Sequence, residues 1–438
     1  MNGKDLVGRL KRLSDVEKPK DIRQLTHALF PGAHCPLFGA MLAIRGIKDA
    51  YMLLVGTEEC SYYTKSATMG NASFGGVDSR CLSIIVDKHD VTFGAWEKIE
   101  KDFAQVVKEF SPKAVFLVGT CLLEIIGDDI DALARSLSQT HGIPVAAVHT
   151  EHFKTENHLP GVAAVITACK DMMKKRGDGE PRGEYVNVLG QRMGDFGKTE
   201  LHGALVEAGV AIGMTLPSGC TVAEIEAGSA AKVNVVVDAT GLPLAKAMER
   251  EWGVPYVVFE RFTDPDNIHL AYTALFDHLK LPLPARLAEA RKRGQETFEK
   301  GAKALSGIRY IYGNTPLPCF EFNAFMVRLG MIPQLIQTVD LPEPGNVHLK
   351  RVLEINPYVV KTANITPLRY VYDELRPHLY LGHEFAMTLR KKGIEIVRSD
   401  HIASMLGYEV TEAIVTELTR AAGEARKMEQ ERSEHESV

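Results

Sequence analysis

Short apolar runs alternate with longer amphipathic stretches along most of this chain. The runs at 51–55, 82–86 and 114–118 are apolar except for Ser83, which is typical of buried parallel strands. Further strands are predicted at 145–148, 185–189, 233–238, 255–260, 307–312 and 334–338. Helical spacing of apolar residues predicts helices at 95–110, from about 128 onward, and at 160–175, 198–209, 242–252, 284–305 and 320–330. Strands that alternate with helices indicate an α/β protein with parallel sheets covered by helices on both faces.

The alternation falls into three units in series. A polar stretch rich in glycine and proline at 174–184 marks a boundary between the first two units. The long helical region that follows the second unit leads into the third. The predicted divisions are a lead-in at 1–30, domain I at 31–180, domain II at 181–305, domain III with a C-terminal return at 306–423, and a flexible charged tail at 424–438.

Composition excludes several classes of function. The 438 residues carry a formal net charge of −5 and no basic stripe, so no nucleic-acid partner is expected. No apolar run reaches the roughly 18 residues that a membrane span needs. The first residues are charged and lack the apolar centre of a signal peptide. We therefore expect a cytoplasmic protein.

Three of the seven cysteines stand out from the rest. Cys35, Cys60 and Cys121 each lie beside a glycine-rich turn or at the end of an apolar run. Thiolates are the soft ligands that suit iron–sulfur clusters. The usual spacing of two residues between ligands is absent, and three buried small side chains are the alternative. The other four cysteines lack a partner motif: Cys81 starts a predicted strand, Cys169 lies on a predicted helix, and Cys220 and Cys319 are expected in loops.

The residues around these cysteines carry a family resemblance. The segments are Cys-Pro-Leu-Phe-Gly-Ala from Cys35, Gly-Ile-Lys-Asp from Gly46, Asp-Val-Thr-Phe-Gly from Asp90, and Thr-Cys-Leu-Leu-Glu-Ile-Ile-Gly-Asp-Asp-Ile from Thr120. With Cys60, they resemble component 1 of nitrogenase and of nitrogenase-like reductases. The match is strongest over about 30–135 and colinear elsewhere.

The resemblance implies a fold, a cofactor and two partners. Family members have three Rossmann-like domains and pair with a homologous subunit, here an α-type partner in an α2β2 heterotetramer. Cys35, Cys60 and Cys121 match the positions that bind an electron-relay cluster between the subunits, an 8Fe-7S P-cluster or a 4Fe-4S cluster. An ATP-hydrolysing 4Fe-4S reductase docks over this interface, and Phe93 matches an apolar docking residue. An ordinary hydrophobic residue at a helix start is the alternative for Phe93.

The resemblance also bears on the type of subunit. In the α-type subunit, a cysteine after a strand of the second domain binds the catalytic metal cluster, and Asp238 stands at that position here. His383 and His401 lie near the expected place of a second ligand, but surface or core histidines are the simpler interpretation. The chain therefore resembles a β-type subunit, with the catalytic metal cluster in its partner.

One further position separates this chain from nitrogenase. His152 takes the place of a serine that ligates the oxidised relay cluster in the nitrogenase β-subunit, so it is a candidate ligand or simply a packing residue. His152 and the short N-terminal region favour methylthio-alkane reductase, which cleaves C–S bonds of small organic sulfides to methanethiol and a hydrocarbon. The alternatives are a nitrogenase β-subunit, a scaffold for cofactor assembly, and a tetrapyrrole reductase subunit.

Two other motifs favour structural roles. The glycine-rich stretch 190–197 follows a strand but fits neither the dinucleotide fingerprint nor the P-loop, so a loop at the sheet edge is expected. Asp128 and Asp129 are expected to start a helix, where carboxylates are favourable. Glu58 and Glu59 beside Cys60 could tune a cluster or be solvated.

Overall fold

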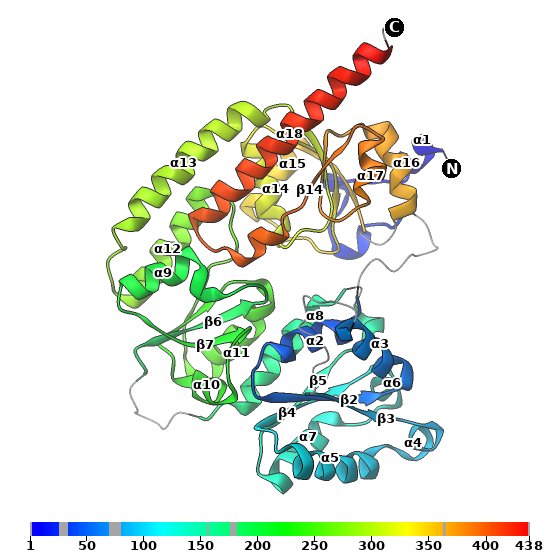
Figure 1. The fold of residues 1–438 in the computed structure, drawn as a ribbon, viewed down its shortest axis with the longest axis vertical. Helices are drawn as coiled ribbons and strands as arrows, with labels where there is room; N and C mark the ends of the chain where they lie inside the picture. Colours follow the sequence, from blue (N-terminus) through cyan, green and yellow to red (C-terminus); the bar gives the residue numbers. More distant parts are fainter. Residues whose placement is uncertain are drawn as a thin grey trace.

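The computed structural model describes residues 2–25, 34–69, 80–155, 157–175, 182–361 and 365–436. Three sheets, each flanked by helices, confirm the expected α/β class (Figure 1). Residues 31–33 before the first cysteine, and 176–181 within the predicted domain boundary, lie outside the described residues. In the described ranges no helix combines the length and the apolar character that crossing a membrane requires.

Domain I is a four-stranded parallel sheet in the order β3-β2-β4-β5. Both central strands are buried almost throughout, as their apolar runs predict. Helices α2 and α8 pack on one face, and α5 and α7 on the other. The elements are α2 (Pro36–Arg45), β2 (Ala50–Gly56), α3 (Glu58–Met69), β3 (Cys81–Ile85), α4 (Lys88–Phe93), α5 (Trp96–Phe110), β4 (Ala114–Gly119), α6 (Cys121–Ile126), α7 (Ile130–His141), β5 (Val145–His149) and α8 (Leu159–Ala168).

Two glycines let α2 and α8 cross in direct backbone contact. A Cβ atom at Gly39 would collide with the carbonyl oxygen of His158, and one at Gly161 would collide with that of Pro36. Larger residues at either position would therefore push the helices apart. This contact fixes the N-terminal end of α2, where Cys35 lies.

Domain II is a second four-stranded parallel sheet, in the order β7-β6-β8-β9. One of its faces shares a continuous apolar core with α2 and α8 of domain I. The elements are β6 (Tyr185–Gln191), α9 (Glu200–Glu207), β7 (Ala211–Pro217), α10 (Val222–Ala227), β8 (Val233–Val236), α11 (Leu242–Trp252), β9 (Tyr256–Val258), α12 (Pro265–Leu279) and α13 (Arg286–Leu305).

Domain III differs from the expected all-parallel sheet. Its six strands run in the order β1-β12-β11-β10-β13-β14, and β1 (Lys11–Arg12) pairs antiparallel with β12. The N-terminal lead-in is thus part of domain III. The remaining elements are α1 (Gly3–Val7), β10 (Arg309–Tyr312), α14 (Cys319–Arg328), β11 (Ile332–Gln337), α15 (Val347–Ile355), β12 (Tyr358–Val360), α16 (Ile365–Leu375), β13 (Leu379–Leu381), α17 (Ala386–Arg390) and β14 (Glu395–Val397).

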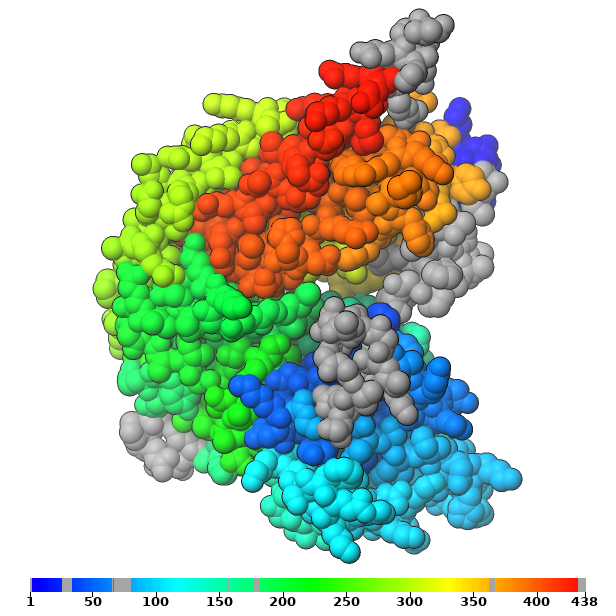
Figure 2. Space-filling view, viewed as in Figure 1, coloured from blue at the N-terminus to red at the C-terminus, as the bar shows by residue number. Residues whose placement is uncertain are grey.

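The charged C-terminal segment continues as a helix. Helix α18 (Tyr408–Glu436) runs along α13 and across the face seen in Figure 2, where it is coloured red. Ala421, Ala422 and Ala425 are buried in the core of domain III, so part of the expected tail is anchored by packing. At its start, Tyr408 joins the core of domain II, and α18 therefore ties domains II and III together.

Candidate functional site

Cys60 and Cys121 follow the two central strands of domain I. Because β2 and β4 are parallel neighbours, with Val55 opposite Gly119, the residues after them emerge at the same edge of the sheet. Cys121 is the first residue of α6, and Cys60 lies in the first turn of α3. Partial positive charge at a helix N-terminus favours a negative group such as a thiolate.

Cys35 reaches the same edge from α2, whose N-cap it forms. The ring of the preceding His34 stacks on Phe38 at a centroid distance of 3.9 Å. His34 Nδ1 is also 2.6 Å from the hydroxyl of Tyr63 on α3. These contacts join the segment that carries Cys35 to the helix that carries Cys60.

The structure brings the three predicted thiols together. Burial raises the pKa of the Cys60 thiol, and the nearby Cys121 and Cys35 raise it further. Burial and then Cys35 raise the pKa of Tyr63 to about 12. All three cysteines are partly exposed and form no disulfide. A cationic metal centre would relieve the repulsion between three such thiolates, so the donor set fits an iron–sulfur cluster.

His152 contacts Cys121 through its main chain. Its backbone N–H donates a hydrogen bond to Cys121 Sγ at 3.3 Å, while its side chain is exposed in the short 3₁₀ helix η4 (His152–Lys154). Hydrogen bonds to sulfur are one means by which a protein sets the potential of a cluster. Ligation by the imidazole stays a prediction.

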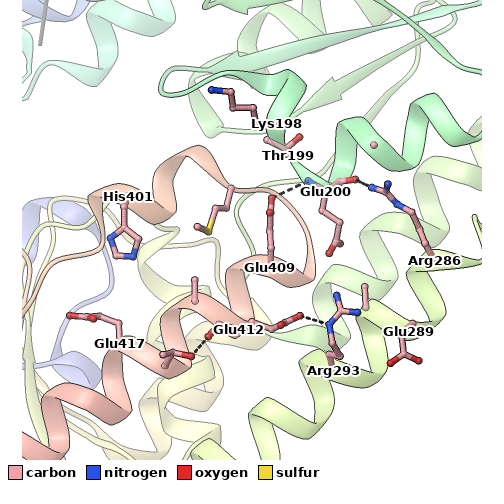
Figure 3. A pocket seen from close by; sticks show the side chains of 15 residues that line it. Lys198, Thr199, Glu200, Arg286, Glu289, Arg293, His401, Glu409, Glu412 and Glu417 are labelled. Atoms are coloured by element: carbon pink, nitrogen blue, oxygen red, sulfur yellow. Dashed lines mark hydrogen bonds and ion pairs between the residues drawn. The ribbon is translucent and has the colours of Figure 1, made fainter.

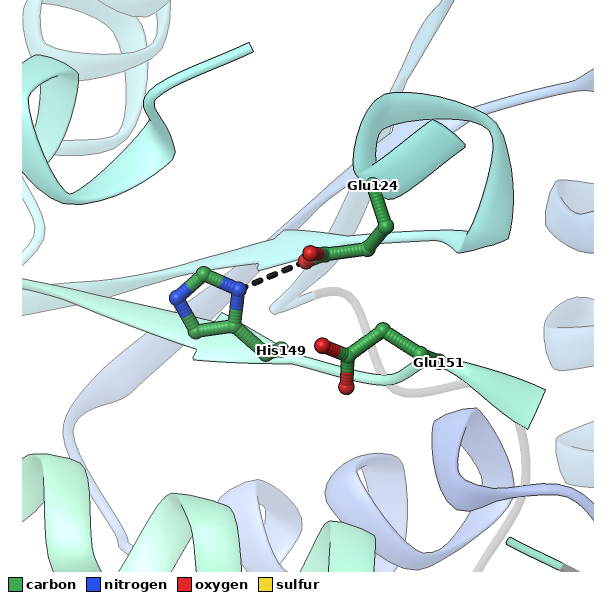
Figure 4. A group of neighbouring side chains, drawn as sticks. All are labelled: Glu124, His149 and Glu151. Atoms are coloured by element: carbon green, nitrogen blue, oxygen red, sulfur yellow. Dashed lines mark hydrogen bonds and ion pairs between the residues drawn. The ribbon is translucent and has the colours of Figure 1, made fainter. Parts of the chain in front are cut away.

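A charged network that sequence reasoning missed lies beside Cys121. His149 Nδ1 is 2.6 Å from Glu124 Oε1 (Figure 4). Its Nε2 is 3.1 Å from Asp131 Oδ2. Burial lowers the pKa of His149, but the two carboxylates outweigh this effect and raise it. Glu124 lies on α6, which follows β4, and His149 is the last residue of the adjacent strand β5; this placement is the signal that could have revealed the pair.

The same network offers three ligand atoms to a metal ion. Those of Glu124, His149 and Glu151 lie within 4.8 Å of one another (Figure 4). However, both ring nitrogens of His149 already face carboxylates, and Glu151 pairs with Lys154 at 2.7 Å. An imidazolium held between carboxylates is the arrangement that these contacts support.

Phe93 lies at the C-terminal end of α4 rather than at a helix start. Its side chain is 76% exposed, and the ring of His89 lies 4.7 Å away. Val91 on the same helix is also exposed. Exposure of a large aromatic side chain is what a docking residue requires.

The other cysteines lie away from these thiols. Cys81 begins β3 at the opposite end of the sheet, as expected, and Cys169 and Cys220 are buried between domains I and II. Cys319 is not in a loop, because it forms the first residue of α14 in domain III. Among the described residues, Cys35, Cys60 and Cys121 are therefore the candidate ligand set.

A comparison with protein families decides the identity of the fold. The family described as nitrogenase component 1 type oxidoreductase matches residues 35–434, which is nearly the whole chain. The chain belongs to the nitrogenase component 1 family.

The similar proteins include both catalytic and assembly members of this family. The α chain of the nitrogenase molybdenum–iron protein of Methanothermobacter marburgensis is 27% identical over 400 residues, covering 86% of this chain and 84% of that protein. The nitrogenase iron–molybdenum cofactor biosynthesis protein NifE of Clostridium pasteurianum is 29% identical over 230 residues. That match spans about half of each protein, 51% and 49% respectively. The solved structure titled "Nitrogenase Cp1 at pH 6.5" shares the fold, with a TM-score of 0.76, 16% identity and coverage of 91% and 93%.

Asp238 stands at the position where the family resemblance predicts a cofactor-binding cysteine in an α-type subunit. Both of its carboxylate oxygens already have partners within the chain. Arg192 donates two hydrogen bonds to its Oδ2, at 3.0 and 2.8 Å, and Arg261 lies 3.6 Å from the same oxygen. Thr240 donates two more to Oδ1. Burial would raise the pKa of Asp238, but the two arginines lower it. A carboxylate held in this way is not free to bind a metal.

The remaining candidates fall into structural roles. His383 and His401 are exposed, and His383 bonds to Asp400 at 3.0 Å. Asp129 caps α7 by accepting a hydrogen bond from the backbone of Ala132, as the paired acids predict. Gly190, the next to last residue of β6, packs against Asp238, so a side chain at position 190 would have no space.

Proposed function

We propose that this chain is the β-type, electron-relay subunit of a nitrogenase-like two-component reductase. Cys35, Cys60 and Cys121 hold its half of an iron–sulfur cluster, and a homologous α-type partner completes the cluster. The observation that carries this proposal is the convergence of three partly exposed thiols at one edge of domain I. Three thiolates from one chain are one short of the four cysteines that a complete cluster usually takes.

Exposed apolar side chains next to the cysteines support a partner at this edge. Tyr62 is 72% exposed, Ile125 is 70% exposed and Phe153 is 58% exposed. Each lies within a few residues of Cys60, Cys121 or His152 in the chain. Large apolar groups around a polar site are characteristic of protein–protein interfaces.

The residues of this chain prepare the site for electron transfer. The starts of α2, α3 and α6 direct partial positive charge toward the thiolates, and the N–H of His152 donates to Cys121 Sγ. A bound cluster supplies one-electron redox chemistry there. Asp238, held by two arginines, supports the absence of a catalytic metal cluster from this subunit.

Replacing Cys121 by alanine tests the relay site. The Cys121→Ala protein, purified with its α-type partner, should lose the relay cluster and electron delivery, because one thiolate ligand is gone. Iron content and the electron paramagnetic resonance spectrum are the measurements. Cys81→Ala is the matched control, since Cys81 lies at the other end of the same sheet. An unchanged spectrum and iron content in Cys121→Ala would remove the basis of the proposal.

Replacing Phe93 by alanine tests the docking of the ATP-hydrolysing reductase. We expect weaker coupling of the reductase with full retention of iron, because an exposed aromatic contact is lost. The Michaelis constant for the reductase should rise several-fold. Phe385→Ala, an exposed phenylalanine in domain III, should leave it unchanged. Normal turnover and coupling in Phe93→Ala would reject the docking role.

For the substrate we propose small organic sulfides, as in methylthio-alkane reductase. The departure at His152 from the nitrogenase pattern supports this choice. Release of methanethiol from a methyl alkyl sulfide, driven by the reductase and ATP, is the test. Ammonia formation from dinitrogen without methanethiol release would instead identify a nitrogenase. An interfacial cluster of about four irons, with reduction of a tetrapyrrole, would identify that branch.

The similarity to NifE favours a second candidate, a scaffold on which a metal cofactor is assembled. A scaffold would transfer its metal cluster to an apo-enzyme and would not reduce substrate. Incubating the purified complex with an apo-enzyme that lacks its cofactor separates the two roles. Transfer of metal without catalytic turnover would establish the scaffold and contradict the reductase.

A further inference from the structure

A pocket with an excess of positive charge is lined by residues of α12, of α13 with the loop before it, and of the start of α18. Figure 1 shows the course of these three helices. Its volume is about 440 Å³, within the range of small-molecule sites. Leu283 and Leu287 form much of its apolar wall, with Tyr272 and Tyr408 beside them. Neither the relay site nor the docking surface uses these residues.

Arg291 is the unusual side chain of this pocket. Its Nε atom is buried and has no hydrogen-bond partner among the described residues. Leaving a charged donor unpaired costs free energy, so such a group is expected to have a partner that the chain itself does not provide. The neighbouring Lys292 also lines the pocket, and no carboxylate in the described part of the chain forms an ion pair with either cation.

Two acids beside this pocket are engaged elsewhere. Glu200 accepts hydrogen bonds from the hydroxyl of Tyr272 and the backbone of Tyr408, and Asp266 pairs with Arg328 at 3.0 Å. The wall itself contains no aspartate or glutamate. Positive charge is therefore left in a pocket whose lining is otherwise mainly apolar.

The adjacent pocket has the opposite character. It lies between α9, α13 and α18, has a volume of about 1010 Å³, and includes five glutamates in its wall (Figure 3). Its Arg293 is paired with Glu412 at 3.3 Å, although Arg293 is only two residues from Arg291. The two pockets therefore differ in their acids, because the larger one has carboxylates in its wall and the smaller one has none.

We propose that this pocket binds a small organic anion, with a carboxylate or phosphate group on Arg291 and Lys292 and an apolar body against Leu283 and Leu287. The planar guanidinium is suited to either group, because both accept two parallel hydrogen bonds. The hydroxyl of Tyr408, which lies 3.3 Å from His269 Nδ1, is within the same wall and adds a polar contact.

Titration calorimetry on the full chain with three probes tests this site. Phenyl phosphate and benzoate carry the two possible anionic groups, and benzyl alcohol is the neutral control. We expect saturable binding of at least one anion and none of the alcohol, and the tighter anion identifies the group. Arg291→Met should weaken binding at least tenfold, equivalent to about 1.4 kcal/mol. Arg293→Met should bind as the wild type does.

A second variant keeps the test decisive if Arg291→Met does not fold. Ala288 is exposed on α13 and lines the pocket, so Ala288→Phe should fill the space without disturbing the core. We expect this variant to abolish binding. The proposal is wrong if neither anion binds the wild type at millimolar concentration, if the alcohol binds equally well, or if Ala288→Phe binds normally.

Discussion

Replacing Asp238 by alanine should destabilise domain II by about 3 kcal/mol. The variant removes the carboxylate that balances Arg261, whose side chain is only 3% exposed. Breaking a buried ion pair by removing one partner costs about 3–5 kcal/mol. The lower end applies because Arg192 is 18% exposed and can turn toward water. Arg261 also keeps its hydrogen bonds to Val237 and Gln191.

Glu260 should partly replace the lost charge. Burial and then Asp238 raise the pKa of Glu260 to about 7, above the ordinary value of 4.5. A carboxyl with a raised pKa stabilises the fold at low pH, and this contribution is lost as the pH rises from about 4.5 to about 7. Without Asp238 the pKa of Glu260 falls, so this loss of stability should become smaller. The deficit of Asp238→Ala should therefore be larger at pH 5 than at pH 8.

Urea unfolding followed by tryptophan fluorescence measures this effect within one domain. The chain has two tryptophans, Trp96 in domain I and Trp252 at the end of α11 in domain II. In a Trp96→Phe background, fluorescence reports on domain II alone. With a slope of about 2 kcal/mol per molar urea, a loss of 3 kcal/mol lowers the midpoint by about 1.5 M.

The matched control is Glu249→Ala. Glu249 is an exposed acid on α11, and its carboxylate forms no ion pair within the described residues. Its midpoint should move by no more than the equivalent of about 0.5 kcal/mol. A midpoint for Asp238→Ala that matches this control would refute the reasoning, because the carboxylate would then contribute nothing to the balance of charge around Arg261.

Two further changes probe the edge of domain I. Burial and the nearby Arg192 lower the pKa of His158 from 6.5 to about 4. The unfolded chain therefore binds the proton first, and stability should fall by about 3 kcal/mol as the pH drops from about 6.5 to about 4. In His158→Gln this acid sensitivity should disappear from pH-dependent urea curves, and its persistence would contradict the assignment. Gly56→Ala places a Cβ against the Thr120 side chain and should cost about 1–3 kcal/mol. Since this strain lies where β2 and β4 end, just before Cys60 and Cys121, iron retention should also drop. Unchanged thermal stability and iron content would argue against close packing there.

The strands that lie at the centres of sheets were predictable from the sequence. The runs around β2 and β4 are apolar at nearly every position, because both faces of these strands are covered by helices. The ends of β2 and β4 also indicated where Cys60 and Cys121 emerge. Long-range contacts were not predictable in this way. Strand β1 has only two residues, which are too few to show the alternation of a strand. Its pairing with β12 depends on a partner almost 350 residues away.

The charged groups of the site were also predictable in position but not in their contacts. The pattern placed Asp238 at the end of the predicted strand 233–238, but its pairing with Arg192 and Arg261 depends on the geometry of three separate segments. The hydrogen bond from His152 to Cys121 Sγ was not predictable from the side chain either, since the main chain makes it. Sequence patterns indicate which residues leave a sheet together, whereas their hydrogen bonds depend on packing.

The pairing of β1 with β12 has a consequence for synthesis on the ribosome. Lys11 and Arg12 are made more than 300 residues before their partners Tyr358 and Val359. Domains I and II can form their own sheets during this interval, while the residues of β1 have no strand to pair with. Until β1 pairs with β12, one side of β12 remains an open edge that another chain could occupy. The order of translation thus leaves the completion of the third sheet until β12 has been made, when it can pair with a segment synthesised much earlier.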